Sequence, residues 1–164
     1  MKSKKNTFVS RAAVGCVTTA IFLLLCIIKG IYPFGIATLD TVDFQSQWIP
    51  AYYHVWDVLH GDGSAFFDWR VGGGNNFAGV SAQFSLFSPF NLFFLFVKRS
   101  WIEKSMIVFI IIKLLAMGYG MRWFLKEQIL KEERYGIYIL AGSVGYAVNG
   151  YTLLYYGMGW LDVA

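Results

Sequence analysis

The sequence predicts an all-α membrane protein, on three observations. Hydrophobic residues make up 57% of the chain and charged residues only 15%, which lies outside the range of ordinary soluble domains. The mean hydropathy is +0.51. The basic residues stand mainly at the edges of long apolar runs, where they set the orientation of transmembrane helices. We therefore interpret the net charge of +4 as a topology signal and expect no nucleic-acid partner.

The first element is a transmembrane helix predicted over residues 12–29. Its apolar run begins at Ala12 and ends before Lys29, which is long enough to cross the hydrocarbon core. Residues 1–11 carry four basic side chains and are expected in the cytoplasm, because short cytoplasmic segments collect Lys and Arg. No small-residue cleavage site follows the run, so an uncleaved helix is expected rather than a signal peptide.

Residues 30–104 are predicted to form an external loop with two juxtamembrane helices. The first, at about residues 50–60, has an apolar side at helical spacing, begins at Pro50 and ends before Gly61. Its apolar side continues a pattern that starts earlier, at Phe44 and Trp48. The second, residues 84–97, is apolar but short and is interrupted by Pro89, which suits a re-entrant or interfacial helix better than a full crossing.

Two further transmembrane helices are predicted over residues 105–121 and 135–158, with a cytoplasmic link at 122–134. The link carries Arg122, Lys126, Lys131 and Arg134. If residues 84–97 do not cross the membrane, this basic link lies in the cytoplasm with the amino terminus; if they do cross, it faces outward against the positive-inside rule. We therefore favour three spans in a multi-pass protein of the cell membrane, with residues 159–164 beginning a further part.

The order and spacing of several short motifs resemble the YfhO family of bacterial membrane proteins, over about residues 30–164. The motifs are Asp43-Phe44-Gln45-Ser46-Gln47-Trp48-Ile49-Pro50, Gly63-Ser64, Phe66-Phe67, Trp69, Gly72, Gly74, Asn76-Phe77, Ser88-Pro89-Phe90-Asn91-Leu92, Gly150 and Trp160-Leu161-Asp162. The resemblance departs at Asp68-Trp69-Arg70, where the family tends to have Ser-Trp-Asn.

This resemblance implies the amino-terminal part of a polytopic GT-C type glycosyltransferase, since such proteins are several times longer. An enzyme of this type takes a sugar from a polyprenyl-phosphate donor, and the family is implicated in decorating cell-envelope polymers such as teichoic acids. The implied active site lies in the first external loop. A lipid or ion transporter or flippase component, or a non-catalytic membrane scaffold, are the alternatives.

Sugar transfer needs a base for the acceptor proton and a cation or metal for the departing phosphate. Asp43 matches the family acid and is the predicted base, with Asp40, one turn earlier, as second candidate. Either carboxylate can ligate Mg²⁺ or Mn²⁺, but no residue spacing requires a metal. Whether the protein uses a divalent metal as cofactor therefore stays open.

Four further residues are predicted to contact substrate: Gln47, Arg70, Lys113 and Asp162. Lys113 lies in the middle of a predicted span, where a charge usually faces a cavity or a partner, and a structural ion pair is equally compatible. Arg70 is a candidate phosphate ligand, although an arginine near a bilayer also meets lipid headgroups. The loop aromatics either form an interfacial belt or stack on a sugar, and the sequence does not separate these roles.

Overall fold

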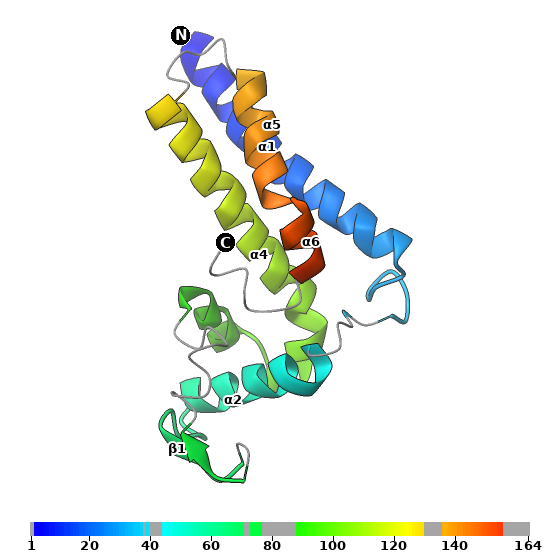
Figure 1. Cartoon of the computed structure of the whole chain (residues 1–164), viewed down its shortest axis with the longest axis vertical. Helices are drawn as coiled ribbons and strands as arrows, with labels where there is room; N and C mark the ends of the chain where they lie inside the picture. The colour runs from blue at the N-terminus through cyan, green and yellow to red at the C-terminus, as the bar shows by residue number, and fades with distance from the viewer. Residues whose placement is uncertain are drawn as a thin grey trace. The chain divides into compact units, whose positions relative to one another are not determined.

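The computed structural model describes residues 2–37, 39, 44–70, 73–76, 88–129 and 136–155, with side chains from Arg11 to Thr152 within these ranges (Figure 1). The chain divides into two compact units. Unit 1 contains Met1–Ile36 and Ile111–Leu154, and unit 2 contains Ala37–Ile110 and Tyr155–Ala164. The polar loop and the membrane-spanning candidates thus fall largely into separate folding units.

Unit 1 is built from helices. Its elements are α1 (Lys2–Ile28), the greater part of α4 (Ile102–Phe124), a π-helical turn η5 (Leu125–Ile129), α5 (Gly136–Ala147) and α6 (Gly150–Tyr155). Within the described residues, two helical stretches are long and apolar enough to cross a membrane, Arg11–Ile28 and Arg99–Ile129. The prediction of an all-α membrane protein is confirmed.

Glycine lets the helices of unit 1 approach closely. A Cβ atom on Gly118 of α4 would lie 3.3 Å from Val14 Cγ1 of α1 and 3.5 Å from Ala147 Cβ of α5. Transmembrane helices associate through such small residues, because lipid tails supply no hydrophobic drive to bring helices together.

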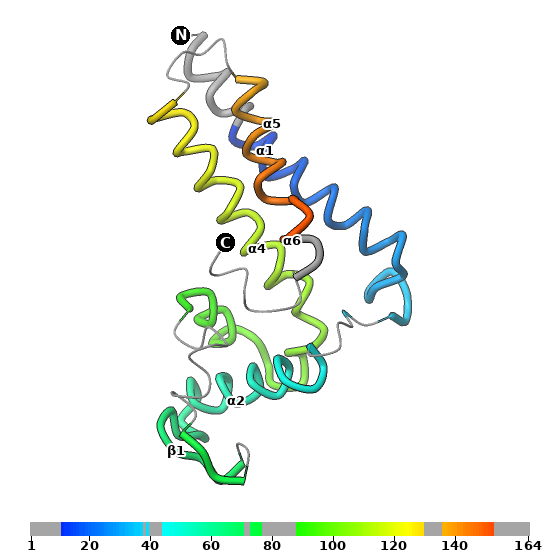
Figure 2. The backbone as a smooth tube through the Cα atoms, viewed as in Figure 1, coloured from blue at the N-terminus to red at the C-terminus, as the bar shows by residue number. Residues whose placement is uncertain are grey.

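The segment predicted as one span over residues 135–158 is interrupted. α5 ends at Ala147 and α6 begins at Gly150, and Figure 2 shows the backbone passing from one into the other. Asn149 causes the break, because its Nδ2 donates to the Tyr146 carbonyl (2.7 Å) and its Oδ1 accepts from the Thr152 amide (2.9 Å). A side chain that bonds to both helix ends satisfies backbone groups that the break leaves without an intrahelical partner. Residues 135 and 156–158 lie outside the described residues.

The helical run around α4 is longer than the predicted 105–121. It begins with a 3₁₀ turn, η4 (Arg99–Trp101), and continues through η5 into the first part of the predicted link at 122–134. Charged residues such as Glu103 and Arg122 end the apolar run but not the helix, since Glu and Arg are good helix formers. Hydropathy therefore marks the apolar part of this helix and not its ends.

Unit 2 is organised around α2 (Ile49–Leu59), which occupies the segment where the sequence pattern predicts an amphipathic helix. A π-helical turn, η1 (Phe44–Trp48), leads into α2, Pro50 stands in the first turn, and Gly61 follows with φ +83°. Glycine at this point allows the left-handed backbone that ends many helices.

A two-residue antiparallel ladder follows α2. β1 (Phe67–Asp68) pairs with β2 (Asn75–Asn76), placing Phe67 opposite Asn76 and Asp68 opposite Asn75. We call this β-hairpin, together with the connection from Gly61 to Phe66, the hairpin segment.

The apolar segment predicted at 84–97 contains a 3₁₀-helix, η3 (Pro89–Phe96), whose start is capped by the Ser88 hydroxyl. Eight residues at about 2 Å per residue reach roughly half the thickness of the hydrocarbon core. η3 is therefore too short to cross, and residues 84–87 lie outside the described residues.

Aromatic rings form the core of unit 2. The Tyr52 ring of α2 lies 5.2 Å from that of Phe94 in η3 and 5.4 Å from that of Phe109 in α4, and Phe94 and Phe109 are 5.0 Å apart. Trp56 Nε1 donates a hydrogen bond of 2.7 Å to the Val97 carbonyl. The apolar side of α2 thus packs against η3 and the start of α4, which leaves its other side to polar contacts.

Candidate functional site

The structure does not place three of the predicted site residues, because Asp40, Asp43 and Asp162 lie outside the described residues. Gln47 is exposed on η1. Lys113 is buried in α4, with 3% of its surface exposed. Gln47 and Lys113 lie in different units, so their roles as substrate contacts stay predictions.

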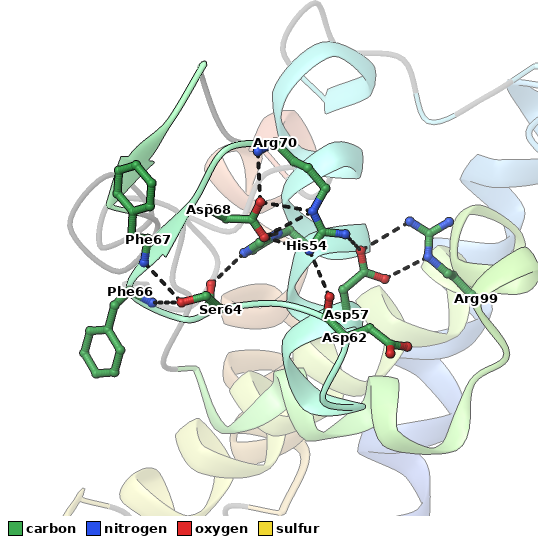
Figure 3. Close-up of polar contacts among 9 residues, drawn as sticks. All are labelled: His54, Asp57, Asp62, Ser64, Phe66, Phe67, Asp68, Arg70 and Arg99. Carbon is green, nitrogen blue, oxygen red and sulfur yellow. Dashed lines mark hydrogen bonds and ion pairs between the residues drawn. The ribbon is translucent and has the colours of Figure 1, made fainter.

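Arg70 instead belongs to a network of polar and charged side chains, which we call the polar cluster: His54, Asp57, Asp68, Arg70 and Arg99 (Figure 3). Asp57 of α2 is its centre. Its carboxylate, only 6% exposed, accepts from Arg99 Nε at 2.8 Å and from Arg70 Nη1 at 3.2 Å. A carboxylate can be buried at this position because two guanidinium groups compensate its charge.

Asp68 holds Arg70 from the other side. Arg70 Nη2 and Nε donate to the Asp68 carboxylate at 2.7 and 3.0 Å, and the Arg70 amide donates to Asp68 Oδ1 at 2.9 Å. Arg70 Nη2 also donates to the Asp62 carbonyl at 3.0 Å. Every nitrogen of the Arg70 guanidinium is therefore engaged within the cluster, which counts against the predicted phosphate contact unless the cluster opens.

His54 joins α2 to the hairpin segment. Its Nε2 lies 3.0 Å from the Ser64 carbonyl oxygen, and because a carbonyl only accepts, Nε2 carries the hydrogen. The other ring nitrogen, Nδ1, faces Asp68 Oδ2 at 3.7 Å. The Ser64 hydroxyl in turn accepts from the Phe66 and Phe67 amides, both at 3.2 Å.

The cluster keeps its two carboxylates ionised. The hydrogen bond from Arg99 lowers the pKa of Asp57 against the opposing effect of burial, and the side-chain hydrogen bonds from Arg70 lower the pKa of Asp68. Carboxylates with a lowered pKa and engaged oxygens are weak proton acceptors. The polar cluster is therefore a brace that ties α2, the hairpin segment and η4 together, rather than a source of a general base.

The described residues contain no group of three His, Cys, Asp or Glu side chains suited to a metal ion. Both carboxylates of the polar cluster, Asp57 and Asp68, are occupied by arginine. Asp40 and Asp43, for which the sequence leaves a metal-binding role open, lie outside the described residues.

Sequence reasoning did not identify the brace, although part of its signal was present. Asp57 follows His54 by three residues on the polar side of an amphipathic helix, which places both side chains on one face. Nothing in the sequence pairs Asp57 with Arg99, which is 42 residues away.

The fold and its braced loop define a class: an all-α membrane protein with a folded polar segment between apolar helices. Comparison with known proteins identifies the family. Residues 15–164 match the family model described as "Bacterial membrane protein YfhO", and the chain belongs to the YfhO family. No curated protein and no solved structure matches the chain.

Proposed function

We propose that this YfhO-family protein takes part in glycosyl transfer of the GT-C type, moving a sugar from a polyprenyl-phosphate donor to a cell-envelope polymer at the outer face of the membrane. Membership of the family over residues 15–164 is the observation that carries the proposal. In the reaction, the acceptor oxygen bonds to the anomeric carbon and the bond from that carbon to the phosphate oxygen breaks. The acceptor proton passes to the base, and the polyprenyl phosphate leaves with the electron pair.

The distribution of basic residues supports a multi-pass topology with the amino terminus in the cytoplasm. Residues 30–104 carry four basic residues in 75 positions, whereas residues 1–11 and 122–134 carry four each in 11 and 13 positions. Short cytoplasmic segments collect Lys and Arg, so this difference in density supports an external position for residues 30–104.

The properties of the polar cluster support Asp43 as the base, with Asp40 as second candidate. Asp57 and Asp68 are held as ions by arginine, so proton transfer falls to a carboxylate outside the cluster. Asp43 directly precedes Phe44, a buried side chain at the start of η1.

The leaving phosphate needs a cation to stabilise its charge, and the Arg70 guanidinium is already bonded to Asp57 and Asp68. Arg99 is the better candidate, because its side chain is 53% exposed and its Nη1 makes no hydrogen bond within the described residues. Lys98 is adjacent and exposed. A divalent metal on Asp40 and Asp43 would supply the same charge stabilisation. Gln47, Lys113 and Asp162 are further proposed contacts to the donor or acceptor.

The test is a complementation experiment with the full-length protein. A strain lacking the gene receives the wild type, Asp43→Asn or Asp62→Asn, and envelope glycans are analysed by mass spectrometry. We expect the wild type and Asp62→Asn to restore a sugar substituent that Asp43→Asn does not restore at equal protein level. The Asp62 carboxylate makes no hydrogen bond or ion pair within the described residues, so it controls for the change of charge. Normal glycans with Asp43→Asn would exclude Asp43 as the base.

Lys113 favours a second candidate function, a transporter or flippase component. A lysine that is 3% exposed within a candidate span is typical of a lipid or ion path, as well as of a structural pair. In the same strain, unchanged glycans together with an altered distribution of lipid between the leaflets would support this alternative.

A further inference from the structure

The hairpin segment presents three aromatic side chains to solvent. Phe66 is 74% exposed, Phe67 49% and Trp69 77%, and we call these three residues the aromatic platform. An exposed aromatic cluster of this kind marks a binding surface more often than an accident of packing.

The platform is held in a fixed arrangement. Gly74, with φ +105°, lies directly against the Trp69 indole: a Cβ atom there would be 2.7 Å from Trp69 Cε3 and 2.9 Å from Cζ3. The Phe67 and Trp69 rings meet edge to face, with centroids 5.2 Å apart. Beneath them, Ser64 and the polar cluster fix the backbone. A preformed aromatic surface spends little conformational entropy when it binds a ligand.

Within unit 2, the platform and η3 lie on different sides of α2. Two residues, Val97 and Lys98, connect η3 to the candidate span Arg99–Ile129. Along α2, His54 lies about 200° around the helix axis from Tyr52 and from Trp56. Tyr52 and Trp56 contact η3 and the residue after it, whereas His54 contacts the hairpin segment. Figure 1 accordingly shows α2 between the short green helix η3 and β1.

The charge of this region selects among ligands. The described part of the hairpin segment carries three charged side chains, Asp62, Asp68 and Arg70, and Asp68 is paired with Arg70. The segment therefore offers no excess of positive charge to an anionic lipid headgroup or a polyanion. The exposed amide side chains of Asn75 and Asn76 stand on β2, opposite Asp68 and Phe67, and supply uncharged hydrogen-bonding groups.

We propose that the aromatic platform binds an uncharged pyranose unit of the acceptor polymer. The C–H face of the sugar ring stacks on the Trp69 indole, Phe66 and Phe67 border it, and Asn75 hydrogen-bonds a ring hydroxyl. This inference rests on the proposed glycosyl transfer in one respect: it identifies the bound sugar as part of the acceptor polymer. The donor sugar is carried on a lipid and therefore reaches the protein from the bilayer.

Binding is tested on the full-length protein in nanodiscs by saturation-transfer NMR. The probes are three uncharged oligosaccharides: maltohexaose, cellotetraose and chitotetraose. We expect transfer to the axial ring hydrogens of at least one probe, with an affinity about tenfold lower in Trp69→Ala and about threefold lower in Trp69→Phe. Trp101→Ala, which removes another exposed tryptophan of unit 2, should bind like the wild type. No transfer from any probe, or equal affinity in Trp69→Ala, would overturn the proposal.

The position of the platform is tested by spin labels at Trp69→Cys and, as control, Phe96→Cys, with Cys16 and Cys26 replaced by serine. We expect a water-soluble nickel complex to relax the label at position 69 and oxygen to relax the label at position 96. A label at position 69 with the collision profile of the bilayer interior would show that the platform is a membrane anchor and end the proposal.

The two proposals fail in different ways. If sugar binding depends on Trp69 but no sugar is transferred in cells, the proposed sugar-binding platform is supported and the proposed glycosyl transfer is refuted. If transfer depends on Asp43 but no sugar binds to the platform, the proposed function is supported and the proposed sugar-binding platform is refuted.

Discussion

Asp57→Asn is the sharpest test of the brace, because the substitution changes charge with almost no change in shape. Asp57 accepts the 2.8 Å bond from Arg99 Nε and the 3.2 Å bond from Arg70 Nη1 while its own surface is 6% exposed. An asparagine keeps one acceptor oxygen and places an amide donor against a guanidinium group. The local fold then loses both the charge and one correctly oriented acceptor.

The expected magnitude lies between two limits. Breaking a fully buried ion pair costs about 3–5 kcal/mol, whereas exposed pairs contribute about 0–1 kcal/mol. Asp57 is buried, but the side chain of Arg99 is 53% exposed and is solvated again when the pair breaks. We therefore expect Asp57→Asn to destabilise the braced segment by about 2 kcal/mol. This corresponds to a roughly 30-fold larger equilibrium constant for local opening.

Hydrogen–deuterium exchange with mass spectrometry measures this local opening in the full-length protein. Peptides covering α2 and residues 62–70 should exchange roughly 30-fold faster in Asp57→Asn, while peptides from α1 stay within a factor of two. Asp62→Asn is the matched control, since its side chain is exposed and only its backbone carbonyl joins the cluster. If both variants exchange like the wild type, the polar cluster does not hold this segment.

Three further results are expected. The pKa of Asp57 and of Asp68 in the folded protein lies below the ordinary value of 3.8. The protection of α2 against hydrogen exchange, corrected for the intrinsic exchange rate, should therefore be constant between pH 8 and 5 and fall as the pH drops below 3.8. Protection that weakens between pH 8 and 6 would contradict the expected direction of this pH dependence. Gly118→Leu in α4 should cost about 1–3 kcal/mol and lower the thermal midpoint in detergent, whereas Gly120→Leu, where a Cβ meets open space, should leave it unchanged. Asn149→Ala removes the cap of α6 and should cost about 1 kcal/mol, seen as faster exchange at Thr152 with no change at Ile139.

The sequence predicts those parts of the fold that depend on local pattern. The apolar runs behind α1 and α4 exceed what a soluble domain carries, and the spacing of Tyr52, Val55 and Leu59 predicts the position of α2. Gly61 predicts the end of α2, because its backbone conformation is one that other residues adopt at a cost.

Other parts depend on contacts that a sequence does not display. Hydropathy averages over residues 135–158 and so misses the interruption at Asn149, where a single side chain satisfies the ends of two helices. The pairing of Asp57 with Arg99 depends on α2 packing against η3 through Tyr52 and Phe94, which brings residues 42 positions apart into contact. The predicted phosphate contact of Arg70 considered its charge but not the carboxylates that would compete for it.

The brace also explains how the loop tolerates the departure at residues 68–70 from the pattern of the family. Where the resemblance leads us to expect Ser-Trp-Asn, this chain has Asp68-Trp69-Arg70. Asp68 and Arg70 bond to each other, and Arg70 also donates to the buried Asp57. An ion pair therefore joins the residues on either side of Trp69. Since Asp68 and Arg70 hold the backbone while Trp69 stays 77% exposed, the ion pair stiffens the presentation of the indole and leaves its surface open to a ligand. Replacing both charged residues together, as Asp68→Ser with Arg70→Asn, should therefore loosen the hairpin segment in hydrogen exchange and weaken sugar binding, because the aromatic platform is then ordered only when the ligand binds. Unchanged binding in a double variant with a loosened hairpin segment would show that the affinity does not depend on this ion pair.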